Sequence, residues 1–571
     1  MSPHDPKTLP WWKRTVVYQI YPRSFKDSTG NGIGDIPGII SKLDYLKDLG
    51  IETIWFSPFF ASPQKDHGYD VSDYRSIAPE YGTLNDCERL IAEIHSRNMY
   101  VVFDMVLNHT SEQHPWFMES RSSRDNPKRD WYIWRDGKKP GGKKPPTNWN
   151  SMIGGSGWHY DDLTEQWYWA QFLPFQPDLN HRNPEVKQEM FDTMRFWLDK
   201  GVDGFRLDII NTIYEDEHLQ DNPFAMKYMP SEEDSKGFFH DNIHTINHPD
   251  NFVFVKELRS VMDEYSDPER FLVGEVGASL EVLKQYCGEA ADSKTDGLHM
   301  VFQFQSLGVK LEAIKLRKLM LAYEEFFSEP YTPTWVFSNH DRTRRISVLG
   351  ADINKAKLNA ILQLTARGVP FIYMGEEIGM LNHRIPLRNA QDPVALKFSK
   401  LPQFFINLVQ KITGVSLNRD DCRTPMQWNS SSNAGFSKPE VEPWMPIGPN
   451  HKEINVEVEE KKTESLLNCY KDLLYLRSNT PALHSGSMSI KNLAKFRGQI
   501  LSYERRFNGN GSKQVVEVWL NLSKKEISIG DIKGERHLLY STLHHCSPIL
   551  DNGIHLRPFQ GIIAERKMDN P

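Results

Sequence analysis

The chain has 571 residues, of which 39% are hydrophobic and 12% aromatic, so it can bury a large core, unlike a disordered sequence. Its formal net charge of −7 is mildly acidic with both signs mixed along the chain, which argues against nucleic acid and anionic membranes as partners. The 15 Trp and 21 Tyr residues fit an aromatic-rich core or sugar-binding surfaces, and composition alone favours the core.

Cysteine usage and the N-terminal segment both point away from secretion. The scattered cysteines form no CxxC pair, which argues against a thiolate zinc site, and their odd number suits a reducing compartment. Residues 1–14 lack the apolar segment of a signal peptide, and no run of about 18 apolar residues occurs. We therefore expect a soluble cytoplasmic protein. The cysteines are Cys87, Cys287, Cys422, Cys469 and Cys546.

Eight short apolar, β-rich segments recur over the first 380 residues, and helix-period stretches lie between most of them. Strands that are apolar throughout are buried on both faces, which is typical of parallel sheets. Eight such strands alternating with helices predict an α/β fold, a (β/α)8 barrel. The predicted strands are 15–21, 51–57, 100–106, 204–209, 271–276, 298–304, 334–339 and 369–374, and the helices include 39–49, 84–97, 184–200, 311–325 and 353–367.

Three stretches depart from this alternation. A long segment rich in Trp, Gly and Lys separates the third strand from the next helix and predicts an inserted loop domain, domain B. A second excursion, 376–446, follows the eighth strand. Near the C-terminus, short alternating runs at 499–504 and 514–522 predict an antiparallel β domain. The predicted domains are the barrel at 1–108 and 181–487, domain B at 109–180 and a C-terminal β-sandwich at 488–571.

Polar residues stand where four of the apolar strands end, and catalytic groups of such barrels lie at the carboxyl ends of strands. A single charged residue at such a position is usually part of a structural ion pair. Polar or charged residues at four strand ends together favour a functional site. These residues are Asn108 and His109 after strand three, Arg206 and Asp208 at strand four, Glu275 after strand five, and Asn339, His340 and Asp341 after strand seven.

The chemistry that fits this set is glycosidic bond cleavage. The sequence has no HExxH, no zinc-ligand spacing, no Walker A motif and no nucleophile elbow. Two facing carboxyls can act as an ionised nucleophile and as an acid of raised pKa that protonates the leaving oxygen. An arginine two residues before the nucleophile would hold it ionised and lower its pKa. A third carboxylate and the histidines would grip the sugar hydroxyls.

Five motifs, in this order, resemble the conserved regions of glycoside hydrolase family 13, the α-amylase family: DMVLNH at 104–109, QPDLN at 176–180, GFRLD at 204–208, GEV at 274–276 and SNHD at 338–341. The opening WWKRTVVYQIYPRSF and RTPMQW at 423–428 are similar to its α-glucosidase and oligo-1,6-glucosidase branch. The resemblance covers nearly the whole chain.

The resemblance implies a retaining, exo-acting enzyme that removes terminal α-linked glucose from small oligosaccharides, without an organic cofactor. It assigns Asp208 as nucleophile, Glu275 as acid/base and Asp341 as transition-state stabiliser. It also implies that Tyr69 stacks on the glucose ring, and that Asp66 and Arg423 grip the far hydroxyls and close the pocket. The full set of implied substrate-binding residues is Asp66, Tyr69, His109, Phe172, Gln176, Arg206, His340 and Arg423.

This chain departs from the branch pattern at Ile153-Gly154-Gly155, where Phe-Gly-Gly is common, which leaves the matching aromatic wall open. The residue after the nucleophile, Ile209, is similar to the apolar β-branched residue of α-1,6 enzymes, whereas α-1,4 enzymes tend to carry Thr or Ala. The bulk of its side chain would crowd an α-1,4-linked ring. The alternative is that Ile209 has only a packing role in the barrel. We expect α-1,6 linkages, with α-1,4 as the alternative.

The loop at 27–35 resembles the divalent-cation loop of the branch. Oxygen-bearing side chains alternate with glycines, an arrangement that can wrap a hard cation. We expect a structural Ca²⁺ or Mg²⁺ ion of low affinity, because two positions are neutral, and the alternative is a plain Gly-rich turn with Asp caps. The expected ligands are Asp27, Thr29, Asn31, the Ile33 carbonyl and Asp35.

Two other functions stay open at this point. A non-catalytic relative, such as the heavy chain of amino-acid transporters, shares this barrel but carries a membrane span and an incomplete catalytic set. A transglucosylase or isomerase acting on sucrose, maltose or trehalose would use the same active site, and the sequence does not separate it from a hydrolase. The oligomeric state, monomer or dimer, is also open.

Overall fold

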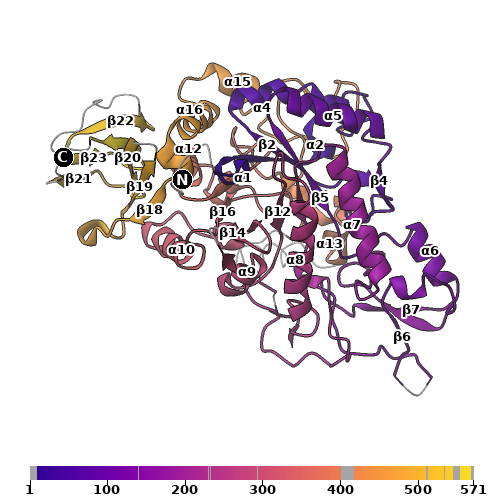
Figure 1. Ribbon diagram of the computed structural model, residues 1–571. Coiled ribbons are helices and arrows are strands. Elements are labelled where there is room, and N and C mark those ends of the chain that lie inside the picture. Colours follow the sequence, from indigo (N-terminus) through magenta and orange to yellow (C-terminus); the bar gives the residue numbers. More distant parts are fainter. Residues whose placement is uncertain are drawn as a thin grey trace.

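The computed structural model describes residues 9–567 apart from 139–140, 229, 232, 292–293, 400–416, 510–511, 531, 533 and 544–552. At its centre is an eight-stranded parallel sheet rolled into a barrel (Figure 1). All eight predicted strands are confirmed, each within its predicted segment. They are β1 (Val17–Ile20), β2 (Thr53–Phe56), β5 (Tyr100–Met105), β9 (Gly204–Leu207), β12 (Phe271–Gly274), β15 (Met300–Val301), β16 (Thr334–Val336) and β17 (Val369–Tyr373).

The barrel closes through side chains. The hydrogen-bonded ladder runs β15-β12-β9-β5-β2-β1-β17-β16, so β15 and β16 are its two ends. Between them the Gln303 backbone N–H donates to Thr334 Oγ1 (3.1 Å), and the Gln303 side-chain carbonyl accepts from the Thr334 backbone N–H and hydroxyl. One amide side chain therefore replaces the missing backbone pairing at this seam.

Helices surround the barrel as predicted, with one correction. α5 (Leu84–Ser96), α7 (Pro184–Asp199), α10 (Ala313–Phe326) and α12 (Ile353–Thr365) match predicted helices, and Thr83 and Asp86 form a capping box at the start of α5. The single helix predicted at 39–49 is wrong, because the chain forms α3 (Ile36–Ile40) and α4 (Leu43–Leu49) with a turn between them.

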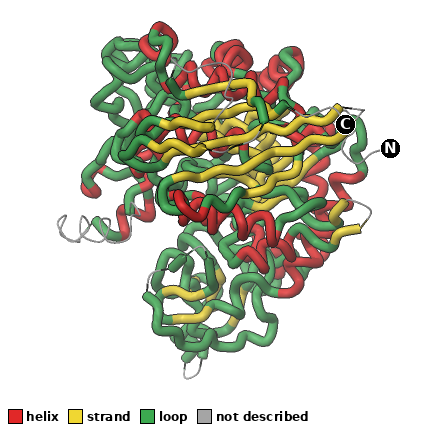
Figure 2. Tube along the Cα trace, turned by 90° about the vertical axis from the view of Figure 1, so that its left-hand side faces the viewer, coloured by secondary structure: helices red, strands yellow, loops and turns green. Residues whose placement is uncertain are grey.

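The inserted segment after β5 forms a small domain around tryptophans. Its three-stranded antiparallel sheet has the order β6 (Trp134–Arg135), β8 (Gln166–Trp169) and β7 (Trp158–Asp161). Trp149, Trp158 and Trp169 are almost fully buried in its core, so here the aromatic content serves packing. The domain protrudes from one side of the barrel (Figure 2).

The C-terminal strands form an antiparallel domain on the other side of the barrel (Figure 1). Its main sheet has the order β18 (Ser487–Ile490), β19 (Ile500–Gly509), β20 (Ser512–Asn521), β24 (Gly561–Arg566) and β22 (Arg536–Ser541), and β21 (Ile527–Gly530) pairs with β23 (Gly553–Leu556). Tyr503 shares a hydrogen bond with Thr365 of α12, which ties the domain to the barrel (2.5 Å). Cys546 lies outside the described residues.

The amino ends of the strands make the floor of the barrel. The short helix α1 (Trp11–Arg14) lies there, and the Trp11 ring stacks on Tyr100 at the start of β5 with centroids 3.8 Å apart. Trp11 and Trp12 join the apolar cluster inside the barrel and so plug this end. Among the described residues, no helix combines the length and apolar character needed to cross a membrane.

Candidate active site

The carboxyl ends of the barrel strands bring the predicted catalytic residues together. Asp208 follows β9 directly, Glu275 follows β12, and Asp341 lies five residues beyond the end of β16. Because neighbouring parallel strands end at the same edge, these three side chains from distant parts of the sequence meet at one mouth. All three belong to one network of hydrogen bonds and ion pairs, described below.

Arg206, the third residue of β9, is the centre of the network. Its Nη1 lies 2.6 Å from Asp208 Oδ1 and 2.8 Å from Asp104 Oδ1, and its Nη2 contacts Glu275 Oε2. Asp104 also accepts a hydrogen bond from Trp55 Nε1 (3.2 Å). One buried guanidinium thus holds both predicted catalytic carboxyls in fixed positions, which a rigid, bidentate arginine does better than lysine.

Burial changes the pKa values of Asp208 and Glu275 relative to carboxyls exposed to water. Burial raises the pKa of Glu275 to about 8, while Arg206 works in the opposite direction and the nearby Asp208 adds to the increase. Burial also raises the pKa of Asp208, although Arg206 lowers it in part. The hydrogen bond between the two carboxyls favours the proton on Glu275 and the charge on Asp208. Arg206 lowers the pKa of Asp208, as the sequence predicted, but desolvation is the larger effect, so the pKa is raised overall.

Asp341 is held ionised. Its Oδ1 lies 2.5 Å from Arg423 Nη2 and 3.4 Å from Arg419 Nη1, and its backbone N–H donates to Asn339 Oδ1 (2.9 Å). Burial opposes ionisation, but His340 and the two guanidinium charges together keep the pKa of Asp341 well below its usual range. A fixed negative charge therefore faces the Asp208–Glu275 pair.

Arg419 is a site residue that the sequence analysis missed. It lies in a short 3₁₀ helix (Arg419–Cys422) and its Nη2 contacts Asp66 Oδ1 and Asp392 Oδ1, both at 2.7 Å. Asp66 also accepts a hydrogen bond from Gln176 Nε2 (3.1 Å), as expected if both residues line one pocket. The available signal was an arginine four residues before Arg423, in the segment NRDDCRTPMQW.

Tyr69 and two histidines complete the predicted set. Gln19 Nε2 lies 2.7 Å from His340 Nδ1, His340 Nε2 lies 2.6 Å from the Tyr69 hydroxyl, and that hydroxyl donates to Asp104 Oδ2 (3.3 Å). His109 Nε2 is 3.2 Å from the Tyr69 carbonyl oxygen, and burial lowers the pKa of His109 to about 4, so the ring is neutral. Phe172 lies beside His109, with ring centroids 5.8 Å apart.

Ile209, the residue after Asp208, has a left-handed backbone with φ 36° and ψ 45°. A β-branched residue rarely adopts this conformation, and strained residues of this kind gather at functional sites. The next backbone N–H, that of Ile210, donates to the Glu275 carbonyl oxygen (3.1 Å), which links the strand ends that carry Asp208 and Glu275. The Ile209 side chain is half-buried rather than part of the barrel core.

Near the Ile153-Gly154-Gly155 departure, a phenylalanine arrives from another loop. A Cβ on Gly154, which has φ +87°, would lie 3.0 Å from the ring of Phe238. Phe238 lies between β10 (Lys236–Gly237) and β11 (His240–Asp241), in the long loop after β9. An aromatic ring is therefore present beside this wall, although position 153 itself is aliphatic.

The predicted cation loop is held together by its own acids. Asp27 accepts hydrogen bonds from the Gly30 and Gly32 backbone N–H groups (2.6 and 3.0 Å), and Thr29 Oγ1 lies 3.4 Å from its Oδ1. Asp35 accepts four hydrogen bonds, including one from Gly38 as the N-cap of α3. The four hydrogen bonds to Asp35 use both of its carboxylate oxygens. The described residues contain no group of three His, Cys, Asp or Glu side chains placed to hold a metal ion.

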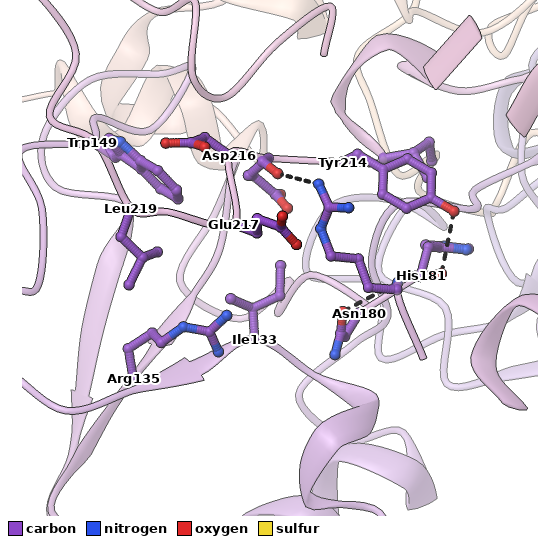
Figure 3. A pocket seen from close by; sticks show the side chains of 12 residues that line it. Ile133, Arg135, Trp149, Asn180, His181, Tyr214, Asp216, Glu217 and Leu219 are labelled. Atoms are coloured by element: carbon purple, nitrogen blue, oxygen red, sulfur yellow. Dashed lines mark hydrogen bonds between the residues drawn. The ribbon is translucent and has the colours of Figure 1, made fainter. Parts of the chain in front are cut away.

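A separate cavity of about 20 Å³ lies between the inserted domain and the loop after β9, with Tyr214, Asp216 and Glu217 around it (Figure 3). This volume holds about one water molecule. The buried carboxyl of Glu215 also lines it and accepts from Trp169 Nε1 (3.0 Å). Burial raises the pKa of Glu215 to about 8 and, with the nearby Glu215 charge, that of Asp178 well above its usual value.

The chain is similar to known enzymes over most of its length. A family model described as alpha amylase, catalytic domain, matches residues 19–486. A probable alpha-glucosidase of Rhizobium meliloti (strain 1021) is 40% identical over 507 residues, 87% of each chain. An oligo-1,6-glucosidase of Halalkalibacterium halodurans is 37% identical over 570 residues, 96% of this chain and 98% of the relative.

A solved structure with a similar fold is named after a different reaction. The trehalulose synthase from Pseudomonas mesoacidophila MX-45 superposes with a TM-score of 0.85 and 34% sequence identity, covering 98% of this chain and all of that one. Relatives named as glucosidases and a structure named as a trehalulose synthase therefore both match this chain over most of its length.

Proposed function

Since the chain belongs to the α-amylase family of glycoside hydrolases, we propose that it is a retaining, exo-acting α-glucosidase that cleaves terminal α-linked glucose from short oligosaccharides. The observation that carries the proposal is the contact of one guanidinium, that of Arg206, with both Asp208 and Glu275 at adjacent strand ends. The alternative of a non-catalytic relative needs an incomplete catalytic set, and all three carboxyls are present.

The reaction follows from the protonation states. The Asp208 carboxylate attacks the anomeric carbon while Glu275, which carries the proton, gives it to the departing glycosidic oxygen. This step forms a covalent β-glucosyl ester on Asp208 and leaves Glu275 ionised. Glu275 then takes a proton from a water molecule as its oxygen attacks the anomeric carbon, the bond from that carbon to Asp208 breaks, and α-glucose leaves with both carboxyls in their starting states. The ionised Asp341 stabilises the oxocarbenium-like transition states through the sugar hydroxyls.

The exo-action would come from the contacts behind the terminal glucose. Arg419 joins Asp66, on the loop before β4 (Asp73–Ile77), to Asp341 and so bridges segments from opposite parts of the sequence. Arg423 is fully buried beside them. In this proposal these ion pairs would close the end of the pocket that a longer chain would have to cross, so that only a chain end would fit.

Proton NMR of freshly formed glucose tests the mechanism. With isomaltose as substrate, we expect the α-anomer first and the β-anomer only through mutarotation, because two displacements restore the configuration. Initial release of the β-anomer would rule out the retaining pair, and the Asp208–Glu275 carboxyls should lie roughly 5 to 5.5 Å apart in a substrate complex.

A second function, glucosyl transfer or isomerisation, is favoured by the trehalulose synthase likeness. Both reactions share the glucosyl-enzyme and differ in whether water or a sugar hydroxyl attacks it. Chromatography of products from sucrose, maltose, trehalose and isomaltose separates them. Free glucose as the main product supports hydrolysis, and isomers or longer saccharides as the main product support transfer.

For linkage we propose a preference for α-1,6 over α-1,4 bonds, supported by the half-buried Ile209 next to the nucleophile. Its branched side chain would crowd an α-1,4-linked ring, whereas the extra methylene of an α-1,6 link gives room to bend. Ile209→Ala should shift the isomaltose-to-maltose ratio of kcat/KM towards maltose by about tenfold. If maltose is already preferred and the ratio does not move, Ile209 is not the selector.

We also propose that the loop at 27–35 binds Ca²⁺ or Mg²⁺ weakly and structurally. The proposal is supported by Thr29 Oγ1 lying close to Asp27 Oδ1 within a glycine-rich turn, and the four hydrogen bonds to Asp35 argue for low affinity. Asp27, Thr29, Asn31, Ile33 and Asp35 would hold the ion. EDTA should lower Tm while leaving the initial rate at 25 °C unchanged, and no Tm change on adding Ca²⁺ or Mg²⁺ would contradict it.

A cytoplasmic location is proposed on the basis of cysteine chemistry. Cys87, Cys287, Cys422 and Cys469 are free and buried thiols, as expected for a reducing compartment. Cell fractionation with a glucosidase assay tests the location. Light scattering after size exclusion decides between monomer and dimer.

A further inference from the structure

The floor of the barrel, at the opposite ends of the strands from Asp208 and Glu275, contains a cavity of about 240 Å³. Thr15 and Val16 lie just before β1, Glu52 lies just before β2, and Tyr100 starts β5, so the cavity wall is made by strand beginnings. α16 (Leu466–Asn479) and α17 (Pro481–Ser485) supply the other side. It is twelve times the volume of the water-sized cavity beside the inserted domain.

Two arginines that line this cavity have unused donors. Arg477 of α16 is 1% exposed, and its Nη atoms donate to the carbonyl oxygens of Leu364, Leu483 and Gly368. Its Nε has no hydrogen-bond partner, and neither does the buried Nε of Arg14. Buried donors without partners are costly, and such groups are usually satisfied by a bound water, ion or ligand.

The charges around the cavity are not balanced. Glu52 is the single carboxylate among its described lining residues, and it forms no ion pair within the described chain. Burial raises the pKa of Glu52, while Arg477 and Arg14 lower it in part. Burial, reinforced by Arg477, Arg14 and Arg505, lowers the pKa of His484 to about 3, so this ring adds no charge of its own. The cavity wall therefore carries two positive charges, on Arg14 and Arg477, against the one carboxyl of Glu52.

Trp11 and Tyr100, whose rings stack on each other, also line the wall. Aromatic side chains of this kind suit the face of a sugar or another small ring. Positively charged donors together with aromatic side chains in one cavity wall are the features expected for a small anionic metabolite rather than for a neutral glucan.

We propose that this cavity is a binding site for a small phosphate-bearing ligand, either inorganic phosphate or the phosphate group of a sugar phosphate, held by Arg14 and Arg477 at the floor of the barrel. The Nε–H groups of the two arginines donate to the phosphate oxygens. Glu52 opposes binding by charge repulsion, and the Trp11–Tyr100 stack packs against the sugar of a larger ligand. The site does not depend on the proposed catalytic function.

The test is calorimetry on the whole protein with inorganic phosphate, glucose 6-phosphate and glucose, at constant ionic strength. Phosphate and glucose 6-phosphate should bind and glucose should not. Arg14→Gln should weaken binding about tenfold or more, and Glu52→Gln should tighten it severalfold, since one removes a donor and the other removes the repulsion. Tighter binding of glucose 6-phosphate than of phosphate identifies a sugar phosphate as ligand, and equal affinities identify inorganic phosphate.

The matched control is Arg75→Gln, which removes an exposed arginine paired with Glu189 far from the cavity and should leave binding unchanged. Arg477→Lys gives a second variant that keeps the buried charge if Arg14→Gln is unstable. No heat with either phosphate ligand, equal binding by the Arg14, Glu52 and Arg75 variants, or displacement of the ligand by isomaltose would each overturn the proposal.

Discussion

The two ends of the barrel use buried arginines in opposite ways. At the mouth, Arg206, Arg419 and Arg423 each contact at least one carboxylate, at 2.5 to 2.7 Å. At the floor, Arg477 donates to backbone carbonyls and contacts no carboxylate among the described residues. The same residue type therefore pairs with the carboxyls of Asp208, Glu275 and Asp341 at one end, and at the other it keeps Nε donors that we propose bind an anion.

This difference shows why burial alone does not identify a catalytic site. A buried charge needs a partner, and at the mouth the partners are acids whose pKa values are set by burial and by the arginines together. At the floor the backbone supplies part of the compensation, so no acid there is prepared for chemistry. Substitutions at the mouth should change the reaction, and equivalent substitutions at the floor should not.

The largest difference in kcat/KM should come from replacing one carboxylate at each end of the barrel. Asp208→Asn deletes the nucleophile and should lower kcat/KM for isomaltose by about 10⁴-fold or more. Glu52→Gln, the corresponding change at the floor, should leave kcat/KM within about twofold. Steady-state kinetics with circular dichroism as a check on folding measures both. Activity above a hundredth of the unsubstituted level in Asp208→Asn would remove this residue from the chemistry.

Replacing an arginine at each end should give a smaller difference in kcat/KM than replacing a carboxylate. Arg419→Gln breaks the contacts to Asp66 and Asp392, and kcat/KM should fall roughly ten- to a hundredfold, mainly through KM. Arg14→Gln at the floor should change neither constant. A fall in kcat with constant KM in Arg419→Gln would mean that Arg419 acts on the transition state instead of on glucose binding.

The pH dependence sharpens the contrast further. Catalysis needs Glu275 protonated, and burial raises its pKa to about 8, so kcat/KM should fall about tenfold per pH unit above that value. Because burial also raises the pKa of Asp208, the acid limb should lie above that of an ordinary aspartate. With an activated aryl glucoside, Glu275→Gln should lose the basic limb, whereas Glu52→Gln should keep the whole profile. A basic limb below pH 6 would contradict the assignment.

The smallest expected effect is on thermal stability and comes from Glu215, which lies beside the inserted domain and not at the mouth or the floor of the barrel. Its folded pKa of about 8 exceeds that of an unfolded glutamate, so its contribution to stability is present at low pH and is lost as pH rises through the folded value. Glu215→Gln avoids this loss and keeps the hydrogen bond from Trp169. We expect Tm to rise by about 2 °C at pH 8 and to stay equal near pH 4. A lower Tm at pH 8 would show that the carboxylate is stabilised there.

The sequence predicted the mouth well because the signal was local. An apolar strand followed at once by a charged residue marks Asp208 and Glu275, and the parallel topology places the ends together. Arg419 was missed because it belongs to no strand end, and Phe238 because its contact with Gly154 joins two insertions. The floor cavity could not be predicted, since Arg14, Glu52 and Arg477 are brought together only by the fold. The pKa of Asp208 depended on the degree of burial, which a motif does not specify.

The seam between β15 and β16 carries a consequence for how this barrel can change over evolutionary time. Elsewhere in the sheet, backbone atoms hold neighbouring strands, so side chains are free to vary without breaking the ladder. At the seam the side chains of Gln303 and Thr334 are themselves the ladder. Neither residue can be replaced alone without leaving a buried group of the other unpaired, so these two positions are expected to be inherited as a unit.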